Sequence, residues 1–468
     1  MLRTLLRSGA VSLACAACAA SVQPQTLTPV EQATRDILRE LVEIPSTESG
    51  VGSTPAARAI ERRLLAAGFA HEDVQVVGPN ERKMNLVARL RGRGRGRPIL
   101  LLAHLDVVEA RAEDWSPDLP PFRFVERDGF YYGRGTQDIK DGAALLTANI
   151  IRWKEERWVP SRDLVLALTA DEEAGDDNGV EWLLAHRREL VDAEYCLNTD
   201  SGDFQSKDGR PYIVSLAAAE KKATAMRLET KNPGGHGSLP RKDNAIYALA
   251  AALGRVEAFR FPVMLSPLTR AELERTAALE TGAVANDLRA AAAGTADDAV
   301  LTRLPENPQY NALLRTTCVA TLVEAGHAAN ALPQRARATL NCRILPGHDP
   351  ADVLAAVRRA IADERVLVAW QFIEKETAPA SPINDEVMRA VETTAARLWP
   401  GVAVMPLLEL GASDGRLLRA AGIPTYGASG VFLDLGDVRA HGRDERVRAK
   451  DVMGGLAFYD GLVRALAR

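Results

Sequence analysis

Histidine and acidic residues follow three expected strands of the chain (residues 98–103, 163–169 and 193–198). The residues that follow these strands are His104, Asp106, Asp171, Glu172, Glu173 and Asp200. The first of these strands, residues 98–103, is an uninterrupted apolar run, which is typical of a strand buried on both faces of a parallel sheet. Ligands bind beyond the carboxyl ends of such strands. The sequence therefore predicts that these side chains meet at one edge of a sheet.

Taken together, these residues suit metal chemistry better than a structural role. His104 alone would more often be a hydrogen-bonded core histidine, and an acidic run alone is usually solvated surface. Adjacent carboxylates in a cleft lose hydration and repel one another, and a divalent cation offsets both penalties. Glu172 and Glu173 could then divide the work, one as a metal ligand and the other as a general base.

Two loops supply further donors. The glycine-rich segment 131–142 carries Asp138 just before an expected helix, and segment 440–446 carries His441 in polar surroundings. A phosphate-binding loop is the competing interpretation of the glycine-rich segment. That segment lacks the Gly-Lys-Ser/Thr ending and does not directly follow a strand. Two imidazoles and three carboxylates suit two zinc ions that share a bridging carboxylate.

The elements that must position these residues alternate in type along the chain. Helices are expected over residues 29–41, 54–67, 142–155 and 178–190, with Thr28 as the N-cap of the first. They alternate with the three buried strands, which predicts an α/β fold with a doubly wound, mainly parallel sheet. A length of 468 residues exceeds what one hydrophobic core usually supports, so more than one domain is expected.

The pattern changes near residue 213, where alternating segments replace the buried runs. Residues 223–229 alternate as a half-exposed strand does, and residues 244–259 are typical of a helix. We therefore expect a catalytic domain made of residues 26–213 and 346–468, interrupted by a smaller α+β domain at residues 214–345.

The motifs resemble those of the co-catalytic zinc peptidases, which include bacterial glutamate carboxypeptidase, aminoacylase, acetylornithine deacetylase, succinyl-diaminopimelate desuccinylase and carnosinase. The resemblance covers nearly all of the chain after its first residues. It rests on His104-Leu-Asp106, Gly133-Arg-Gly-x-x-Asp138-x-Lys140, Asp171-Glu-Glu173, Asp200, Gly234-Gly-His236-Gly-Ser238, Asn330-Ala-Leu-Pro333, Arg343 and His441-Gly-Arg-Asp-Glu445.

The resemblance implies a set of metal ligands. Asp138 would bridge two metal ions, with His104 and Asp200 completing one site and Glu173 and His441 completing the other. Zinc is the expected metal, with cobalt or manganese as alternatives.

The resemblance also implies roles around the metals. Glu172 would be the general base, and Asp106 would orient a ligand histidine. In the inserted domain, His236, Asn330 and Arg343 would bind the substrate carboxylate or the developing oxyanion. Because the family's histidine often reaches into a partner's site, the inserted domain would act as a lid and as the contact of a homodimer.

These roles predict a metallopeptidase of the carboxypeptidase or dipeptidase kind that acts on small peptides. An N-acyl-amino-acid amidohydrolase is the alternative, because both cleave an amide beside a carboxylate. Position 200 is Asp rather than Glu, which favours the peptidase branches, and Arg443 replaces a common proline, which is expected to alter only the loop. A catalytically inactive binding protein is a third interpretation, and the complete set of site residues argues against it.

The composition indicates which classes of binding partner to expect, and the N-terminus indicates the cellular compartment. The net charge is −4 without a long basic run, which does not favour nucleic acid or an anionic membrane surface. At the N-terminus, arginines precede a short apolar run that ends in Ala17-Cys18-Ala19, a pattern typical of a secretory signal over residues 1–20. This apolar run is too short to span a membrane. We expect a soluble, exported protein, periplasmic or secreted, with lipid attachment at Cys15 or Cys18 as the alternative.

Two of the remaining cysteines lie in strand-like runs. Cys318 is within residues 315–323 and Cys342 within residues 336–344. If these runs pair as a hairpin around residue 330, the cysteines face each other, and an oxidising compartment would permit a disulfide. Two buried thiols are the alternative, and the sequence leaves both open.

Overall fold

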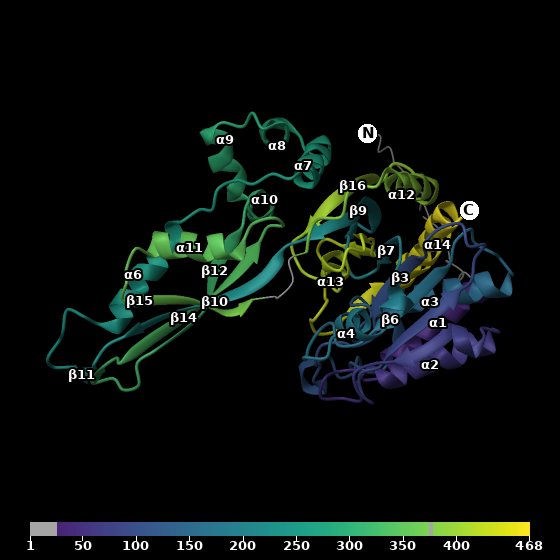
Figure 1. Cartoon of the computed structure of the whole chain (residues 1–468), viewed down its shortest axis with the longest axis horizontal. Helices are drawn as coiled ribbons and strands as arrows, with labels where there is room; N and C mark the ends of the chain where they lie inside the picture. Colours follow the sequence, from purple (N-terminus) through teal and green to yellow (C-terminus); the bar gives the residue numbers. More distant parts are fainter. Residues whose placement is uncertain (1–25, 374–377) are drawn as a thin grey trace, which may run out of the picture.

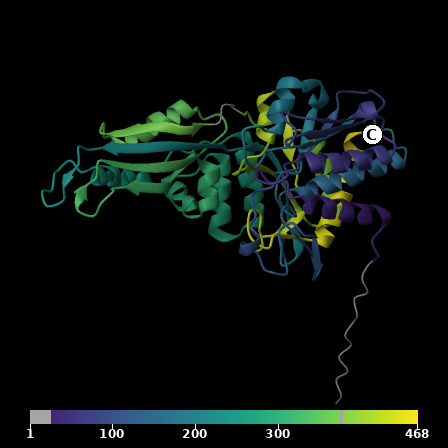
Figure 2. The same ribbon diagram turned by 90° about the horizontal axis from the view of Figure 1, so that it is seen from below.

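The computed structural model describes residues 26–373 and 378–468, which form two lobes of unequal size (Figure 1). The smaller lobe extends from the larger one as an arm, also when seen from below (Figure 2). Helices from opposite ends of the described chain, α1 (Pro29–Val42) and α14 (Ala449–Leu466), pack together in the larger lobe. The predicted signal segment, residues 1–20, lies outside the described residues.

Within those residues, a ten-stranded sheet forms the centre of the larger lobe. Its order is β1-β2-β6-β3-β7-β17-β9-β8-β18, with β16 also paired to β9. The central neighbours β6, β3, β7 and β17 run parallel, as the sequence predicts. The strands are β1 (Val74–Val77), β2 (Asn85–Leu90), β3 (Ile99–His104), β6 (Leu164–Thr169), β7 (Tyr195–Asn198), β8 (Phe204–Lys207), β9 (Arg210–Glu220), β16 (Ala403–Glu409), β17 (Thr425–Gly427) and β18 (Phe432–Asp434).

Helices cover both faces of this sheet, which confirms the doubly wound prediction. Leu101 of β3 belongs to the core under α1, α3 and α14, whereas Leu100 and Leu102 belong to the core under α4 and α13. Thr28 caps α1 as predicted, and the Glu31 carboxylate accepts its backbone N–H at 2.7 Å. The other helices are α2 (Thr54–Ala66), α3 (Lys140–Glu155), α4 (Gly179–His186), α5 (Arg188–Val191), α12 (Asp385–Leu398) and α13 (Gly415–Ala420).

The smaller lobe is built on an antiparallel sheet of order β12-β14-β10-β15. Buried residues of α6 and α11 form a separate core with this sheet. A two-stranded antiparallel sheet, β11 with β13, lies at the end of the arm remote from the larger lobe (Figure 1). The elements are β10 (Lys222–Lys231), β11 (Gly235–His236), α6 (Ala245–Ala258), β12 (Thr317–Ala325), β13 (Ala331–Leu332), β14 (Arg335–Ile344), α11 (Pro350–Ile361) and β15 (Val366–Ile373).

The lobes differ from the expected domain boundaries at residues 214 and 345. β9 stays in the larger sheet as far as Glu220, and β15 pairs with β10, so the smaller sheet extends to Ile373. The intervening helices α7 (Pro267–Leu279), α8 (Gly282–Ala293) and α10 (Pro308–Leu314) contribute buried residues to the larger core, and α9 (Asp298–Arg303) packs against it through the partly buried Val300. The sequence pattern of α11 followed by β15 is compatible with either lobe. Only the pairing of β15 with β10 assigns it to the smaller one.

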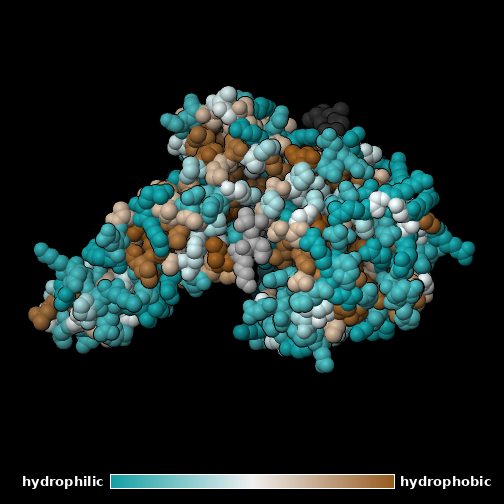
Figure 3. All heavy atoms as spheres, viewed as in Figure 1, coloured by the Kyte–Doolittle hydropathy of each residue, from teal (hydrophilic) through white to brown (hydrophobic). Residues whose placement is uncertain are grey.

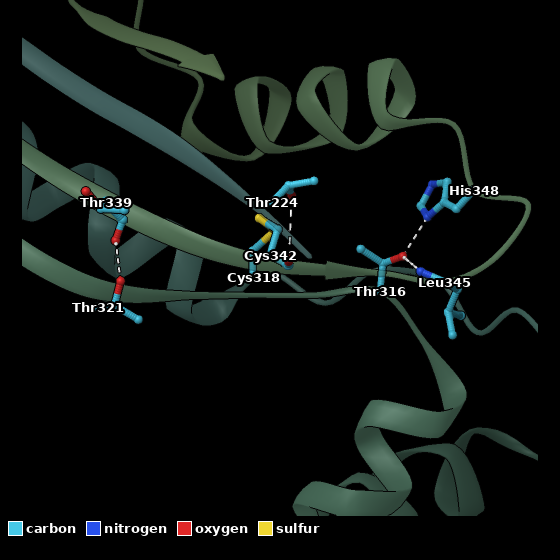
Figure 4. Close-up of a disulfide and its surroundings, with 8 residues drawn as sticks. All are labelled: Thr224, Thr316, Cys318, Thr321, Thr339, Cys342, Leu345 and His348. Atoms are coloured by element: carbon cyan, nitrogen blue, oxygen red, sulfur yellow. Dashed lines mark hydrogen bonds between the residues drawn. A yellow bond between two sulfur atoms is a disulfide. The ribbon is translucent and has the colours of Figure 1, made fainter. Parts of the chain in front are cut away.

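The two strand-like cysteine runs form adjacent strands, with Cys318 opposite Cys342 in the register of β12 and β14. These cysteines form a disulfide (Figure 4), whereas Cys196 is a buried thiol. The visible surface is mostly hydrophilic, with hydrophobic patches on the smaller lobe and between the lobes (Figure 3). No helix among the described residues is long and apolar enough to cross a membrane.

Candidate metal centre

The carboxyl ends of three parallel strands bring the predicted residues together. β3 lies between β6 and β7, with His104 opposite Thr169 and Leu102 opposite Asn198. The acidic run that follows β6 and the Asp200 that follows β7 therefore emerge beside His104.

His104 faces two carboxylates. Its Nε2 lies 3.2 Å from Oδ1 of Asp138 and 3.6 Å from Oδ1 of Asp200. Its Nδ1 lies 3.0 Å from the backbone carbonyl oxygen of Asp106. A proton on Nδ1 donated to that carbonyl leaves the Nε2 lone pair directed at the carboxylates, which is the tautomer a metal ligand requires.

His441 faces the opposite side of the same aspartate. Its Nε2 lies 3.0 Å from Oδ2 of Asp138 and 3.0 Å from Oε2 of Glu173. The two oxygens of Asp138 therefore face two different histidines. Two ligand clusters result, His104 with Asp138 and Asp200, and Asp138 with Glu173 and His441.

The electrostatics of these clusters favour a cation. Burial opposes the ionisation of Asp138, but its hydrogen bonds with His104 and His441 hold its pKa well below the usual range. Hydrogen bonds to Asp138 and Glu173 raise the pKa of His441 to about 10. Burial raises the pKa of Asp200 to about 7, against the opposing effect of His104. Positive charge is thus stabilised between these carboxylates, which is where a metal ion would lie.

The donor set fits two divalent ions. Two imidazole nitrogens and three carboxylates, one of them shared, are ligands that zinc accepts. Burial and Asp200 raise the pKa of Glu172 well above its usual value. A carboxylate of raised pKa beside a metal cluster is the group expected of a general base.

Asp106 contacts the acidic turn rather than the imidazole of His104. Its carboxylate accepts the backbone N–H groups of Glu172 and Glu173, and lies 3.7 Å from Nδ1 of His104. The group of Asp106 that contacts the His104 imidazole is therefore its backbone carbonyl and not its carboxylate. Asp171, at φ +61°, accepts a hydrogen bond from Lys83 at 2.9 Å, which holds this strained turn.

A fully buried glutamate, Glu445, holds the turn that carries Asp138. Its carboxylate accepts backbone N–H groups from Gly135 at 3.0 Å and Gln137 at 2.7 Å, and pairs with Arg134. Gly135 has φ +89°, and a Cβ there would approach the Lys140 side chain at 2.8 Å. The sequence motif includes Glu445, but its spacing gives no sign of this role.

Asp414 is a second residue that the sequence analysis missed. It is buried beneath the acidic turn, where it accepts hydrogen bonds from Asn178 at 2.6 Å and from Thr169 at 3.1 Å. Like Asp171 and Asp200, it stands shortly after a strand of the larger sheet, and that position is the signal that could have identified it.

The three predicted residues of the inserted domain do not meet the metal ligands within one chain. His236 and Asn330 lie at the exposed tip of the smaller lobe, where the Asn330 carbonyl accepts the N–H of Gly237 at 2.7 Å (Figure 1). The Ser238 hydroxyl lies 2.7 Å from Nδ1 of His236. Arg343 is half-buried on β14, opposite Ala223 and Thr317.

Comparison with known sequences identifies relatives over most of the chain. Residues 100–465 match the model of peptidase family M20/M25/M40. Human N-fatty-acyl-amino acid synthase/hydrolase PM20D1 is 30% identical over 380 residues, which cover 78% of this chain and 74% of that protein. Mouse aminoacylase-1 is 26% identical over 371 residues, covering 79% and 80% of the two chains.

Comparison with solved structures supports the same fold. An M20 family metallo-carboxypeptidase from Sulfolobus solfataricus superposes with a TM-score of 0.67 at 16% identity, over 92% of this chain and 98% of that chain. Human carnosine dipeptidase 1 superposes with a TM-score of 0.64 at 14% identity, over 94% and 99%. With the sequence match, these likenesses place the chain in peptidase family M20/M25/M40, whose members are metal-dependent hydrolases of amide bonds.

Proposed function

We propose that this protein binds two zinc ions and hydrolyses the amide bond of N-acyl amino acids. The observation that carries the proposal is the bridging position of Asp138, whose two oxygens lie 3.2 Å from His104 and 3.0 Å from His441. Bound zinc would polarise the scissile carbonyl and lower the pKa of a water molecule toward neutrality.

The protein's own groups then move the proton. Glu172 takes the proton of the attacking water and passes it to the leaving amine, and its raised pKa suits both steps. Asp106 positions Glu172 through the backbone of the acidic turn. Arg343 binds the free carboxylate of the substrate, and His236 and Asn330 contact the developing oxyanion.

The choice of an acyl substrate rests on the sequence relatives. The human relative at 30% identity is named an N-fatty-acyl-amino acid synthase/hydrolase, and the mouse relative at 26% identity is named an aminoacylase. Small peptides are the second candidate class, and the Asp at position 200 favours them. A catalytically inactive binding protein is disfavoured because all five proposed metal ligands and Glu172 are present.

We also propose that the active form is a homodimer joined through β12. This strand lies at the edge of the smaller sheet and exposes Val319, Leu322 and Val323 to 61%, 66% and 62%. An exposed apolar edge strand is a template for pairing with another chain. A second copy would also bring its exposed β11–β13 sheet, with His236, toward a site that the same sheet of this chain does not reach. The Val323→Lys variant should then sediment as a monomer and lose activity.

Export is proposed from the N-terminal pattern together with the cross-strand disulfide. Residues 1–20 read as a secretory signal, and disulfides persist in oxidising compartments. The mature protein would then act in the periplasm or outside the cell. Fractionation of cells expressing the full chain tests this, and intact residues 1–20 on purified protein would contradict it.

The substrate class is tested with a mixed panel. Zinc-loaded protein is incubated with N-acyl amino acids of several chain lengths and with dipeptides, and the products are followed by mass spectrometry. Release of free amino acids from acylated compounds supports the first candidate. Cleavage of dipeptides alone would show that small peptides, the second candidate class, are the substrates. No cleavage of either class by protein that holds two metal ions would support the inactive scaffold.

A further inference from the structure

The carboxylate of Glu220 is buried outside the two ligand clusters and has several partners. Glu220 is the last residue of β9 and is 5% exposed. Its two oxygens accept the hydroxyl and the backbone N–H of Ser413, each at 2.8 Å. It also pairs with the guanidinium of Arg419, itself buried, at 2.6 Å. Burying a carboxylate is costly unless charged and hydrogen-bonding groups satisfy it, and Glu220 has both.

Hydrogen bonds continue from Ser413 to the backbone of the proposed metal ligand Asp200. The Ser413 hydroxyl accepts a hydrogen bond from the side-chain amide of Asn198 at 3.0 Å. The amide oxygen of Asn198 accepts the backbone N–H of Asp200 at 3.1 Å. Asn198 and Ser413 are fully buried, so bulk water does not compete for these bonds. Glu220, Ser413 and Asn198 therefore form a buried network, here called the Glu220 network, that ends at a ligand of the metal centre.

All donors of the Glu220 network point toward the carboxylate. The Asp200 N–H donates to Asn198, and the Asn198 amide donates to Ser413. The single hydroxyl proton of Ser413 then goes to Glu220, because a carboxylate accepts without donating. Glu220→Gln would replace one of two acceptor oxygens by a donor, which would face Ser413 or Arg419, and both of these donate. The network thus depends on the carboxylate as well as on the shape of the side chain.

We propose that Glu220 is a positioning residue for one of the two metal sites. Through the network it holds the backbone of Asp200, and so it raises the metal affinity of the cluster that contains His104. Asp200 does not belong to the cluster that contains His441, so the effect is confined to the first cluster. Partners that hydrogen-bond to metal ligands typically contribute about tenfold to a hundredfold to metal affinity. The inference rests on the proposed function, since it requires that both clusters hold metal ions.

The test is a titration of the metal-free full-length protein with zinc, in which competition with a chelator gives the dissociation constant of each site. Glu220→Gln alters the end of the network. Ser413→Ala interrupts its middle and keeps the pair of Glu220 with Arg419, so it decides the outcome if Glu220→Gln does not fold. Glu272→Gln is the matched control, because Glu272 is also buried in the larger lobe but accepts the backbone N–H of Leu408, at 2.7 Å. Circular dichroism of each metal-free variant shows whether the fold is intact.

Native protein and Glu272→Gln should bind two zinc ions with the same two dissociation constants. Glu220→Gln and Ser413→Ala should each weaken one site by about tenfold to a hundredfold and leave the other unchanged. An Asp200→Ala background identifies the weakened site, because Glu220→Gln should have no further effect there. Unchanged affinity at both sites, or an equal loss at both, would overturn the role of Glu220. Fewer than two ions in the native protein would instead overturn the proposed function, and this inference with it.

Discussion

The carboxylate of Asp106 accepts the backbone N–H of Glu172 at 3.2 Å. Its second oxygen accepts the N–H of Glu173 at 3.0 Å. One side chain at the end of β3 therefore holds the backbone of both a proposed base and a proposed metal ligand, which belong to the turn after β6. Because Asp106 follows β3 and the acidic turn follows β6, this contact fixes where Glu172 and Glu173 lie relative to the end of β3.

Asp106→Asn should lower kcat by about tenfold to a hundredfold while changing KM less, because an amide replaces one of two acceptor oxygens and misplaces the acidic turn. Initial rates over a range of substrate concentrations measure both constants. Glu109→Gln is the control, since Glu109 is exposed and binds only Ser49 in the described structure. An unchanged kcat in Asp106→Asn would show that the turn holds its position without this carboxylate.

Glu172→Gln should retain both metal ions and lose about 10²- to 10⁴-fold in kcat, because the amide has the shape of the carboxylate but cannot accept a proton. Metal content by emission spectroscopy and turnover are measured on the same sample. Normal turnover would refute the assignment of Glu172 as the base. Loss of metal together with turnover would instead make it a ligand.

The larger sheet could be predicted because local patterns specify it. Residues 99–103 and 164–168 are apolar on both faces, so their burial and their parallel partners follow from composition. His104, Glu173 and Asp200 lie close together because parallel strands end at one edge. Asp138 and His441 come from two loops, and only the family resemblance added them to the predicted ligand set.

The remaining features depend on contacts between residues far apart in the sequence. Glu445 binds a turn about 310 positions earlier in the chain, and no spacing indicates that contact. β15 joins the smaller sheet only through its pairing with β10, while α7 to α10 pack on the larger core although they lie within the expected inserted domain. Periodicity predicts the type of such elements and leaves their partners open.

Stability should fall with rising pH through the buried carboxyl of Glu272. Burial raises the pKa of Glu272 to about 8, against the hydrogen bond it accepts from the N–H of Leu408. Because the pKa of Glu272 is higher in the folded than in the unfolded protein, binding of its proton stabilises the fold at low pH. This stabilisation is lost as the pH rises from about 5 to 8. The advantage of native protein over Glu272→Gln in urea unfolding should therefore shrink across this range.

Glu274→Gln provides the control for this comparison, because Glu274 is exposed on the same helix. Any general effect of removing a carboxylate from this helix would appear in this variant as well. If the Glu272→Gln difference is constant with pH, the carboxyl does not change protonation on unfolding.

The disulfide should stabilise the smaller lobe. Cys318 and Cys342 are separated by 24 positions, and closing a loop of that length lowers the entropy of the unfolded chain by an amount worth about 3 kcal/mol. The double variant Cys318→Ala, Cys342→Ala should lose stability of that order in urea. Native protein in reducing agent, which keeps both side chains, is the control and should be destabilised similarly. Two free thiols at these positions in protein isolated from an oxidising compartment would contradict the bridge.

The central claim is that Asp138 joins two metal sites, and counting zinc ions tests it most directly. Native protein and the Asp138→Ala variant are titrated with zinc, and the ions bound per chain are measured after removal of free metal. Two ions in the native protein, with both sites weakened in Asp138→Ala, are predicted, because Asp138 belongs to both ligand clusters. One ion in the native protein, or two tightly bound ions in Asp138→Ala, would contradict a shared carboxylate.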